Sequence, residues 1–171
     1  PIAAMYAGDD PPPPRRPRPT AARAPAPPAP SASARVDPSA PPDVRWFQAA
    51  KAGDVGEMRR LLGSDPAVVA LASKGIGHTA LHWAASAGHA EAVAFLIDEA
   101  RMVPDVRNGG ESPPLHSAAG SGRLRACEVL LDRGASLRAG DSGDATARAL
   151  AVARGMTDVA DFLAKCETEV A

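Results

Sequence analysis

The stretch GHTALHWAASAGH at residues 77–89 decides the fold of this 171-residue chain. Its apolar residues recur at the i, i+3, i+4 spacing of one helix face, and they are Leu81, Ala84 and Ala85. Thr79 is a favourable N-cap for that helix, and Gly88 can end it in the left-handed conformation. A second apolar stripe at helical spacing follows within residues 90–100. The stretch therefore predicts two short helices joined by a tight turn.

The same pattern recurs along the chain at a nearly constant interval. Each copy ends a run of small residues with a glycine, and these glycines are Gly53, Gly88, Gly122 and Gly155. They are separated by 35, 34 and 33 residues. Such a period is typical of a solenoid, in which each helix pair buries an apolar face that it cannot bury alone. The units predicted are residues 43–74, 75–108, 109–141 and 142–166.

Two short motifs carry a family resemblance. The tetrad TALH at residues 79–82 and the sequence PLH at residues 114–116 resemble the Thr-Pro-Leu-His signature of ankyrin repeats. The resemblance covers residues 43–166 and implies an all-α ankyrin-repeat solenoid, with finger loops between stacked helix pairs. It also implies that His82 and His116 tie each helix start to its own loop.

The third unit departs from the family pattern. Pro113 stands where the family has threonine, and Ser112 lies one place earlier. We expect an additional residue in the preceding finger and a helix cap from Ser112. Cys127 occupies the place of Val93 and is expected to be a small buried hydrophobic residue. In the degenerate first unit, Trp46 replaces a core leucine, so we expect a structural role for it.

Composition separates the repeats from an N-terminal arm at residues 1–42. The arm holds 14 of the 18 prolines and no leucine. Proline fixes φ and removes a backbone donor, so we expect an extended, Pro-rich segment without helix or central strand. Residues 11–36 carry five arginines and no acid, which is most often the composition of a solvated tail.

The arm also contains a short motif of another kind. Its prolines and arginines match the PxxPxR pattern of SH3 ligands, which suggests only weakly an SH3-type partner. The residues concerned are Pro11, Pro14, Arg15, Arg16 and Arg18. The Arg-rich, acid-poor composition also resembles organelle-targeting segments. With two cysteines and no CxxC pair, a reducing intracellular compartment is expected, and cytoplasm or organelle (plastid or mitochondrion) stays undecided.

Several function classes lack support in the sequence. The formal net charge is −1, so no nucleic-acid partner is expected, and no apolar run approaches the ~20 residues of a transmembrane helix. His78 and His82 are four residues apart, but no cysteine or carboxylate completes a metal site. The serines have no nucleophile elbow and no base at motif spacing. We therefore expect no enzyme activity, no metal and no cofactor.

A protein-binding surface is the expectation that these features favour. Groove positions on the first helices are assigned to Gln48, Trp83, Ser86, Ser117, Ser121 and Leu150. Candidate contacts in the fingers, residues 74–78, 105–112 and 138–144, are Lys74, His78, Asp105, Arg107, Asn108, Glu111, Arg138, Asp141 and Asp144. Trp83 is either a binding hot spot in the groove or a tryptophan packed across its own repeat.

Two functional hypotheses follow. The first is a non-catalytic protein–protein interaction module that binds through the groove and fingers, with the arm as a second contact. The alternative is an accessory subunit that is permanently bound in a large multi-subunit complex, either organellar or not. The arm of this subunit would contact several other subunits.

Overall fold

The structure is a computed structural model that describes residues 36–169. Within these residues the chain forms α-helices and one short 3-10 helix, η1. They are α1 (Pro42–Ala52), α2 (Val55–Ser64), η1 (Pro66–Ala70), α3 (Ala80–Ala87), α4 (Ala90–Asp98), α5 (Pro114–Gly120), α6 (Leu124–Asp132), α7 (Ala147–Ala153) and α8 (Thr157–Glu169).

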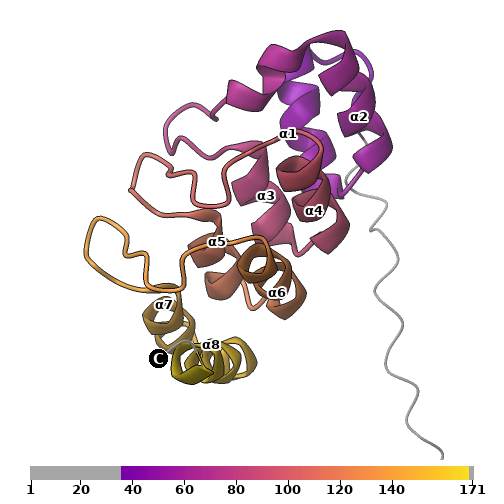
Figure 1. Cartoon of the computed structure of the whole chain (residues 1–171). Helices are drawn as coiled ribbons and strands as arrows, with labels where there is room; N and C mark the ends of the chain where they lie inside the picture. Colours follow the sequence, from indigo (N-terminus) through magenta and orange to yellow (C-terminus); the bar gives the residue numbers. More distant parts are fainter. Residues whose placement is uncertain (1–35, 170–171) are drawn as a thin grey trace, which may run out of the picture.

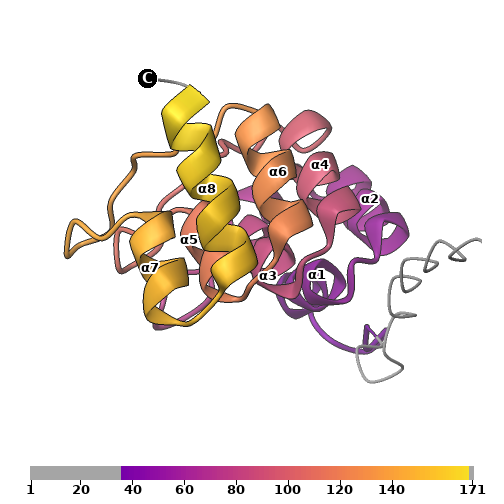
Figure 2. The same cartoon turned by 90° about the horizontal axis from the view of Figure 1, so that it is seen from below.

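The helices are arranged in two parallel rows. The inner helices α1, α3, α5 and α7 lie side by side, and the outer helices α2, α4, α6 and α8 form the second row (Figures 1 and 2). Between the described residues 36 and 169, the only β-pairing is an isolated bridge between Gly140 and Thr146. The prediction of an all-α stack of helix pairs is confirmed.

The core runs between the two rows along the whole stack. Each unit contributes a fully buried large side chain: Trp46, Leu81, Leu115 and, in the last unit, Leu163. Alanines at the helix contacts, such as Ala84 and Ala118, are also fully buried and allow the helices to approach closely. The structural role predicted for Trp46 and the buried position predicted for Cys127 are both observed, since each has 0% exposure.

The turn glycines are needed because the next unit packs against them. Gly53 has φ 72°, and a Cβ there would lie 2.6 Å from Cγ of His89 in the next unit. His89 in turn places Nε2 2.9 Å from the carbonyl oxygen of Lys51, near the end of α1. A side chain at residue 53 would therefore be strained in its backbone and would displace His89.

The third unit corrects two expectations. Ser112 does not cap α5: the residue at the N-cap is Pro113, and no side chain bonds to the helix start there. The additional residue does not lie in the finger at 108–112, because this finger has the same hydrogen-bond pattern as residues 141–145. It lies after α4, where the Met102 amide reaches back to the Leu96 carbonyl while Ala135 pairs with Leu130 after α6. Arg101 there has φ 59°, and it stands at the place of Gly134, whose φ is 89°.

Ion pairs connect neighbouring units along the outer row. Arg59 on α2 pairs with Glu99 just beyond α4 (Nη2–Oε1 2.6 Å), and Arg133 just beyond α6 pairs with Asp98 on α4 (Nη2–Oδ2 2.7 Å). Exposed pairs of this kind contribute little to stability, because solvent screens them. Most of the stability therefore comes from the buried alanines and leucines between the rows.

Residues 36–42 are the part of the predicted arm that the structure describes. Residues 37–40 form a turn rather than an extended chain, and the Asp37 amide donates to Oε1 of Gln48 on α1 (2.9 Å). The SH3-type residues Pro11, Pro14, Arg15, Arg16 and Arg18 lie outside the described residues. Across residues 36–169, no helix has the length and apolarity required to cross a bilayer.

Candidate functional site

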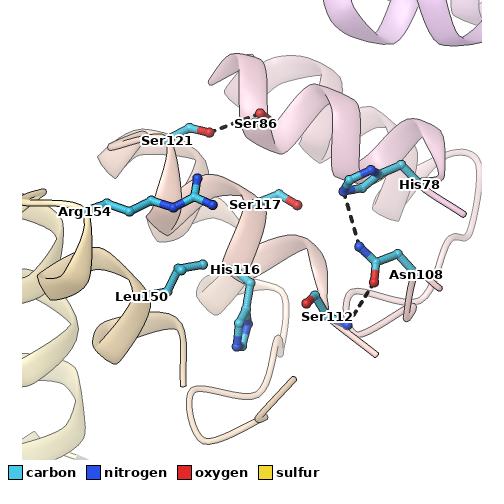
Figure 3. Close-up of a pocket in the computed structure, with 9 residues that line it drawn as sticks. All are labelled: His78, Ser86, Asn108, Ser112, His116, Ser117, Ser121, Leu150 and Arg154. Carbon is cyan, nitrogen blue, oxygen red and sulfur yellow. Dashed lines mark hydrogen bonds between the residues drawn. The ribbon is translucent and has the colours of Figure 1, made fainter. Parts of the chain in front are cut away.

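The inner helices and fingers enclose a groove of about 270 Å³ across the second, third and fourth units (Figure 3). Its helical lining is Ser86 from α3, His116 and Ser117 from α5, Ser121 after α5, Leu150 from α7 and Arg154 after α7. Its finger lining is His78, Asn108 and Ser112. The structure thus brings together six of the predicted groove and finger residues, namely His78, Ser86, Asn108, Ser117, Ser121 and Leu150.

Close contacts between units shape one end of the groove. Oγ of Ser86 lies 3.1 Å from Oγ of Ser121, so the two hydroxyls form a bridge between α3 and the end of α5. Nη1 of Arg154 donates to the Gly120 carbonyl oxygen at 3.3 Å. A Cβ at Gly120 would lie 3.1 Å from both Nη1 of Arg154 and Cδ2 of Leu150. Glycine at position 120 therefore gives both side chains room to lie against α5.

Two buried imidazoles join successive units beneath the groove. Nδ1 of His82 accepts from the Thr79 amide (3.2 Å), so Nε2 carries the proton and donates to the Ser112 carbonyl (2.9 Å). Burial, the dominant cause, lowers the pKa of His82 to about 4, although the bond to Ser112 raises it. The resemblance predicted a bond from His82 to its own loop, and the structure adds a bond to the next finger.

His116 makes only one of the two ring-nitrogen hydrogen bonds that His82 makes. Its Nε2 lies 2.6 Å from the Ala145 carbonyl in the following finger, but Nδ1 is buried and has no hydrogen-bond partner among the described residues. The difference arises at Pro113, which stands in the place of Thr79 and has no amide hydrogen to donate. The departure from the family signature therefore leaves one buried acceptor unsatisfied, since His116 is only 2% exposed.

Trp83 packs against the core but leaves part of its ring exposed. It is half-buried and packs against the core, with the His78 ring centroid 5.0 Å away. Nζ of Lys51 in the first unit lies 3.8 Å from the Trp83 ring centroid, a favourable cation–π geometry. Burial and the nearby Lys51 charge lower the pKa of His78. Trp83 thus packs beside Lys51 and does not line the groove, so its role in binding stays a prediction.

Some predicted contact residues in the fingers have structural partners. Asp105 accepts from the Ser136 amide with both carboxylate oxygens (2.9 and 3.0 Å). Nη1 of Arg107 donates to the carbonyls of Glu111 (2.6 Å) and Gly140 (2.8 Å), which joins two fingers. These bonds hold the shape of the fingers without any partner. Their role as partner contacts stays a prediction.

Asn108 and Asp141 hold equivalent places at the start of two fingers. Oδ1 of Asn108 accepts two amides of its own finger (2.9 and 3.0 Å), and Oδ1 of Asp141 does the same (2.8 and 3.1 Å). The amides of Gly143 and Ala145 lower the pKa of Asp141. The other predicted finger residues are exposed, and they are Lys74, Glu111, Arg138 and Asp144.

Three residues that line the groove were not predicted as partner contacts. His116 and Ser112 had been assigned structural roles from their places in the motif. Arg154 has a readable signal, because it stands 33 residues after Ser121, at the matching position of the next unit. The reach of its side chain back to Gly120 could not be read from the sequence. Through residues 36–169, no three His, Cys, Asp or Glu side chains are grouped as metal ligands would be.

Comparison with known proteins agrees with this architecture. The family described as "Ankyrin repeats (3 copies)" matches residues 46–141, which is more than half of the chain. Rat diacylglycerol kinase iota is 32% identical over 111 residues, covering 63% of this chain and 11% of that protein. A probable E3 ubiquitin-protein ligase of rice, XBOS31, is 35% identical over 96 residues, covering 56% and 21%.

A third relative is named for a different activity. A Caenorhabditis elegans homologue of the transient receptor potential cation channel subfamily A member 1 is 32% identical over 90 residues, covering 53% of this chain and 7% of that protein. The chain thus matches only a small part of each relative, in proteins whose named activities differ. What they share with it is the repeat region. The chain belongs to the ankyrin-repeat family, and its repeats indicate a protein–protein interaction module.

Proposed function

We propose that this chain is a non-catalytic module that binds a protein partner through the inner face, defined here as the groove, the three fingers and the exposed part of Trp83 beside them. The observation that carries the proposal is the groove itself, which is built from side chains of three successive units. Such a site exists only when the units are stacked, because its walls are more than 30 residues apart in sequence. Binding at this face would explain why its polar side chains gather there.

The rigidity of the fingers supports the same proposal. The Gly109 amide donates to the Ile76 carbonyl (3.0 Å), and the Ser142 amide donates to the Gly110 carbonyl (3.2 Å). These bonds connect the first finger to the second and the second to the third. A surface that is ordered before binding loses less conformational entropy on association.

Trp83 is the residue that we propose as the anchor. Tryptophan is enriched among interface residues whose truncation weakens binding most. Its ring is half-buried and lies under Nζ of Lys51, so a partner would either pack beside this cation or replace it. Part of the ring is therefore available without any rearrangement of the core.

The chemistry of the groove favours binding over catalysis. No aspartate or glutamate lines it, and Nε2 of His116 is engaged by the Ala145 carbonyl. The serines therefore have no aligned base–carboxylate pair of the kind that activates a nucleophile. The proposal for this chain is binding alone, and the kinase, channel and ligase activities named for its relatives are not part of it.

We further propose that the arm supplies a second contact. Its five arginines between residues 11 and 36 would bind an acidic part of the same partner or of a neighbouring subunit. A second linked contact raises affinity through effective concentration. We also propose a reducing intracellular compartment, because the thiol of Cys127 is fully buried and unpaired with Cys166.

The test is chemical cross-linking and capture from native lysate with the full chain. Trp83→Ala should lose the captured partner while far-UV circular dichroism stays nearly unchanged. Phe162→Ala is the matched control, since it truncates a half-buried aromatic on the outer helix α8. Equal partner loss in both variants, or equal loss of helix and binding in Trp83→Ala, would contradict the proposal.

The same capture distinguishes the two modes of association. A transient adaptor dissociates in mild washing, whereas an accessory subunit stays with its complex in constant stoichiometry through a density gradient. Removal of residues 1–35 should weaken capture in either case. Unchanged capture by the shortened chain would remove the arm from the proposal.

A further inference from the structure

The side chains that line the groove are almost all uncharged. Four serines, an asparagine, a leucine and two histidines line it, and Arg154 is its one residue with a permanent charge. No carboxylate faces this guanidinium across the groove. The fingers beside the groove carry both signs of charge, so the positive character is confined to the end of the groove at α5 and α7.

Arg154 is held over the groove without an ionic partner. Its side chain is exposed, and across residues 36–169 no acidic side chain lies within 4.0 Å of it. Its one hydrogen bond in this part of the chain is from Nη1 to the Gly120 carbonyl. Arg148, on the same helix α7, is instead paired with Glu167 (2.8 Å). The guanidinium of Arg154 therefore keeps several N–H donors for an external acceptor.

Gly120 makes this position of the guanidinium possible. The matching positions of the first two units carry Lys51 and Ser86, whereas the third has no side chain. Since a Cβ would lie 3.1 Å from Nη1 of Arg154, even alanine would require the guanidinium to shift by a few tenths of an ångström. Gly120 has no positive φ in its helical position, so backbone conformation does not explain the glycine. The space that Arg154 and Leu150 occupy beside residue 120 explains it.

Serine hydroxyls supply neutral donors beside the guanidinium. Oγ of Ser86 and Oγ of Ser121 are bonded to each other, which uses only one of their two hydroxyl hydrogens. In the close-up, Ser117 on α5 lies across from the guanidinium of Arg154, which points toward it (Figure 3). A ligand with two acceptor oxygens could therefore take bonds from Arg154 and from these hydroxyls at once.

We propose that the groove binds the carboxylate of an aspartate or glutamate in a protein partner, with Arg154 as its cation and the serine hydroxyls as further donors. This inference rests on the proposed function. Charge complementarity favours a carboxylate over a phosphorylated residue, because one guanidinium balances one negative charge, whereas a phosphate carries about −1.5 to −2. Arginine also suits the two oxygens of a carboxylate geometrically.

The test uses small probes with the full chain. N-acetyl-glutamate N-methylamide, its glutamine analogue and its phosphoserine analogue are titrated separately and followed by ¹H–¹⁵N NMR. The glutamate probe should produce saturable shifts in the amides of residues 117–121 and 150–155. It should bind about fivefold more tightly than the glutamine probe, the ratio that one exposed ion pair supplies.

Two variants and one control locate the effect. Arg154→Gln should bring the glutamate probe to the affinity of the glutamine probe, and Gly120→Ala should weaken it while keeping the helical signal. Arg125→Gln is the control, because it removes an exposed arginine from the outer helix α6, outside the groove and the fingers, and it should change nothing.

Three results would overturn the inference: equal binding of the glutamate and glutamine probes, unchanged glutamate binding by Arg154→Gln, or tighter binding of the phosphoserine probe. Failure here is separable from failure of the proposed function. If lysate capture depends on Trp83 but not on Arg154, the inner face still binds a partner and only the carboxylate assignment is wrong.

Discussion

Replacing Pro113 by threonine should stabilise the protein, although proline normally rigidifies a chain. The native Pro113 has φ −77° and ψ 165° at the N-cap of α5, and Thr79 has φ −85° and ψ 172° at the N-cap of α3. The two backbones match, so threonine fits at position 113 without rearrangement. Its amide would face Nδ1 of His116, as the Thr79 amide faces Nδ1 of His82.

The expected gain follows from the unsatisfied acceptor. A buried polar atom without a partner costs about 1–3 kcal/mol, and His116 is 2% exposed. Loss of the proline restriction on the unfolded chain costs about 0.4–1 kcal/mol in the opposite direction. The balance is a stabilisation of about 1 kcal/mol, which raises Tm by roughly 3 °C in a domain of this size.

Urea unfolding, followed by circular dichroism, measures this difference. Pro104→Thr is the matched control, because it removes a proline from a turn whose amide faces no buried acceptor, and it should destabilise slightly. In a His116→Leu background, the gain from Pro113→Thr should disappear. The reasoning is refuted if Pro113→Thr destabilises the protein, or if its gain is the same with and without the imidazole.

Three further predictions concern other sites. Glu111→Gly should stabilise by roughly 0.5–1 kcal/mol in urea unfolding, because Glu111 has φ 57° where the first finger uses Gly77; a loss of stability would count against it. The pKa of His82 is lowered to about 4, so the unfolded chain binds a proton first as pH falls below about 6.5. The stability present above that pH should decline towards pH 4 by up to about 1.4 kcal/mol per pH unit, and His82→Gln should flatten the urea-derived slope between pH 7 and 5. Iodoacetamide should label the half-exposed Cys166 long before Cys127, which is fully buried and whose pKa is raised to about 12; mass spectrometry showing equal labelling would contradict this.

The repeat architecture was predictable because its signals are local and periodic. Glycine at the turn and leucine on one helix face act within a single unit, and the unit recurs. Substitutions inside the pattern were also readable: Trp46 and Cys127 take positions of core residues, and both are fully buried. Both assignments follow from the position of the residue within the repeat.

The contacts between units were less predictable, because they depend on where long side chains reach. Arg107 and Asp105 have the exposed, charged character of partner contacts, yet both bond to backbone atoms of a neighbouring segment. Arg154 was missed for the same reason. The additional residue of the second unit was placed in the wrong loop, since the hydrogen bond that locates it, from the Met102 amide to the Leu96 carbonyl, cannot be read from the sequence.

These contacts between neighbours also connect stability to binding. The groove needs α3, α5 and α7 in register, so it depends on both interfaces of α5. His82 joins the first of these interfaces with both ring nitrogens satisfied, whereas His116 joins the second with one nitrogen unsatisfied. In a solenoid, stability is a sum of units and nearest-neighbour interfaces, so the unsatisfied Nδ1 weakens the third unit itself, on which both interfaces depend. Strengthening it through Pro113→Thr would fix the distance between Arg154 and the serines without adding any atom to the groove, and probe affinity should then rise together with Tm.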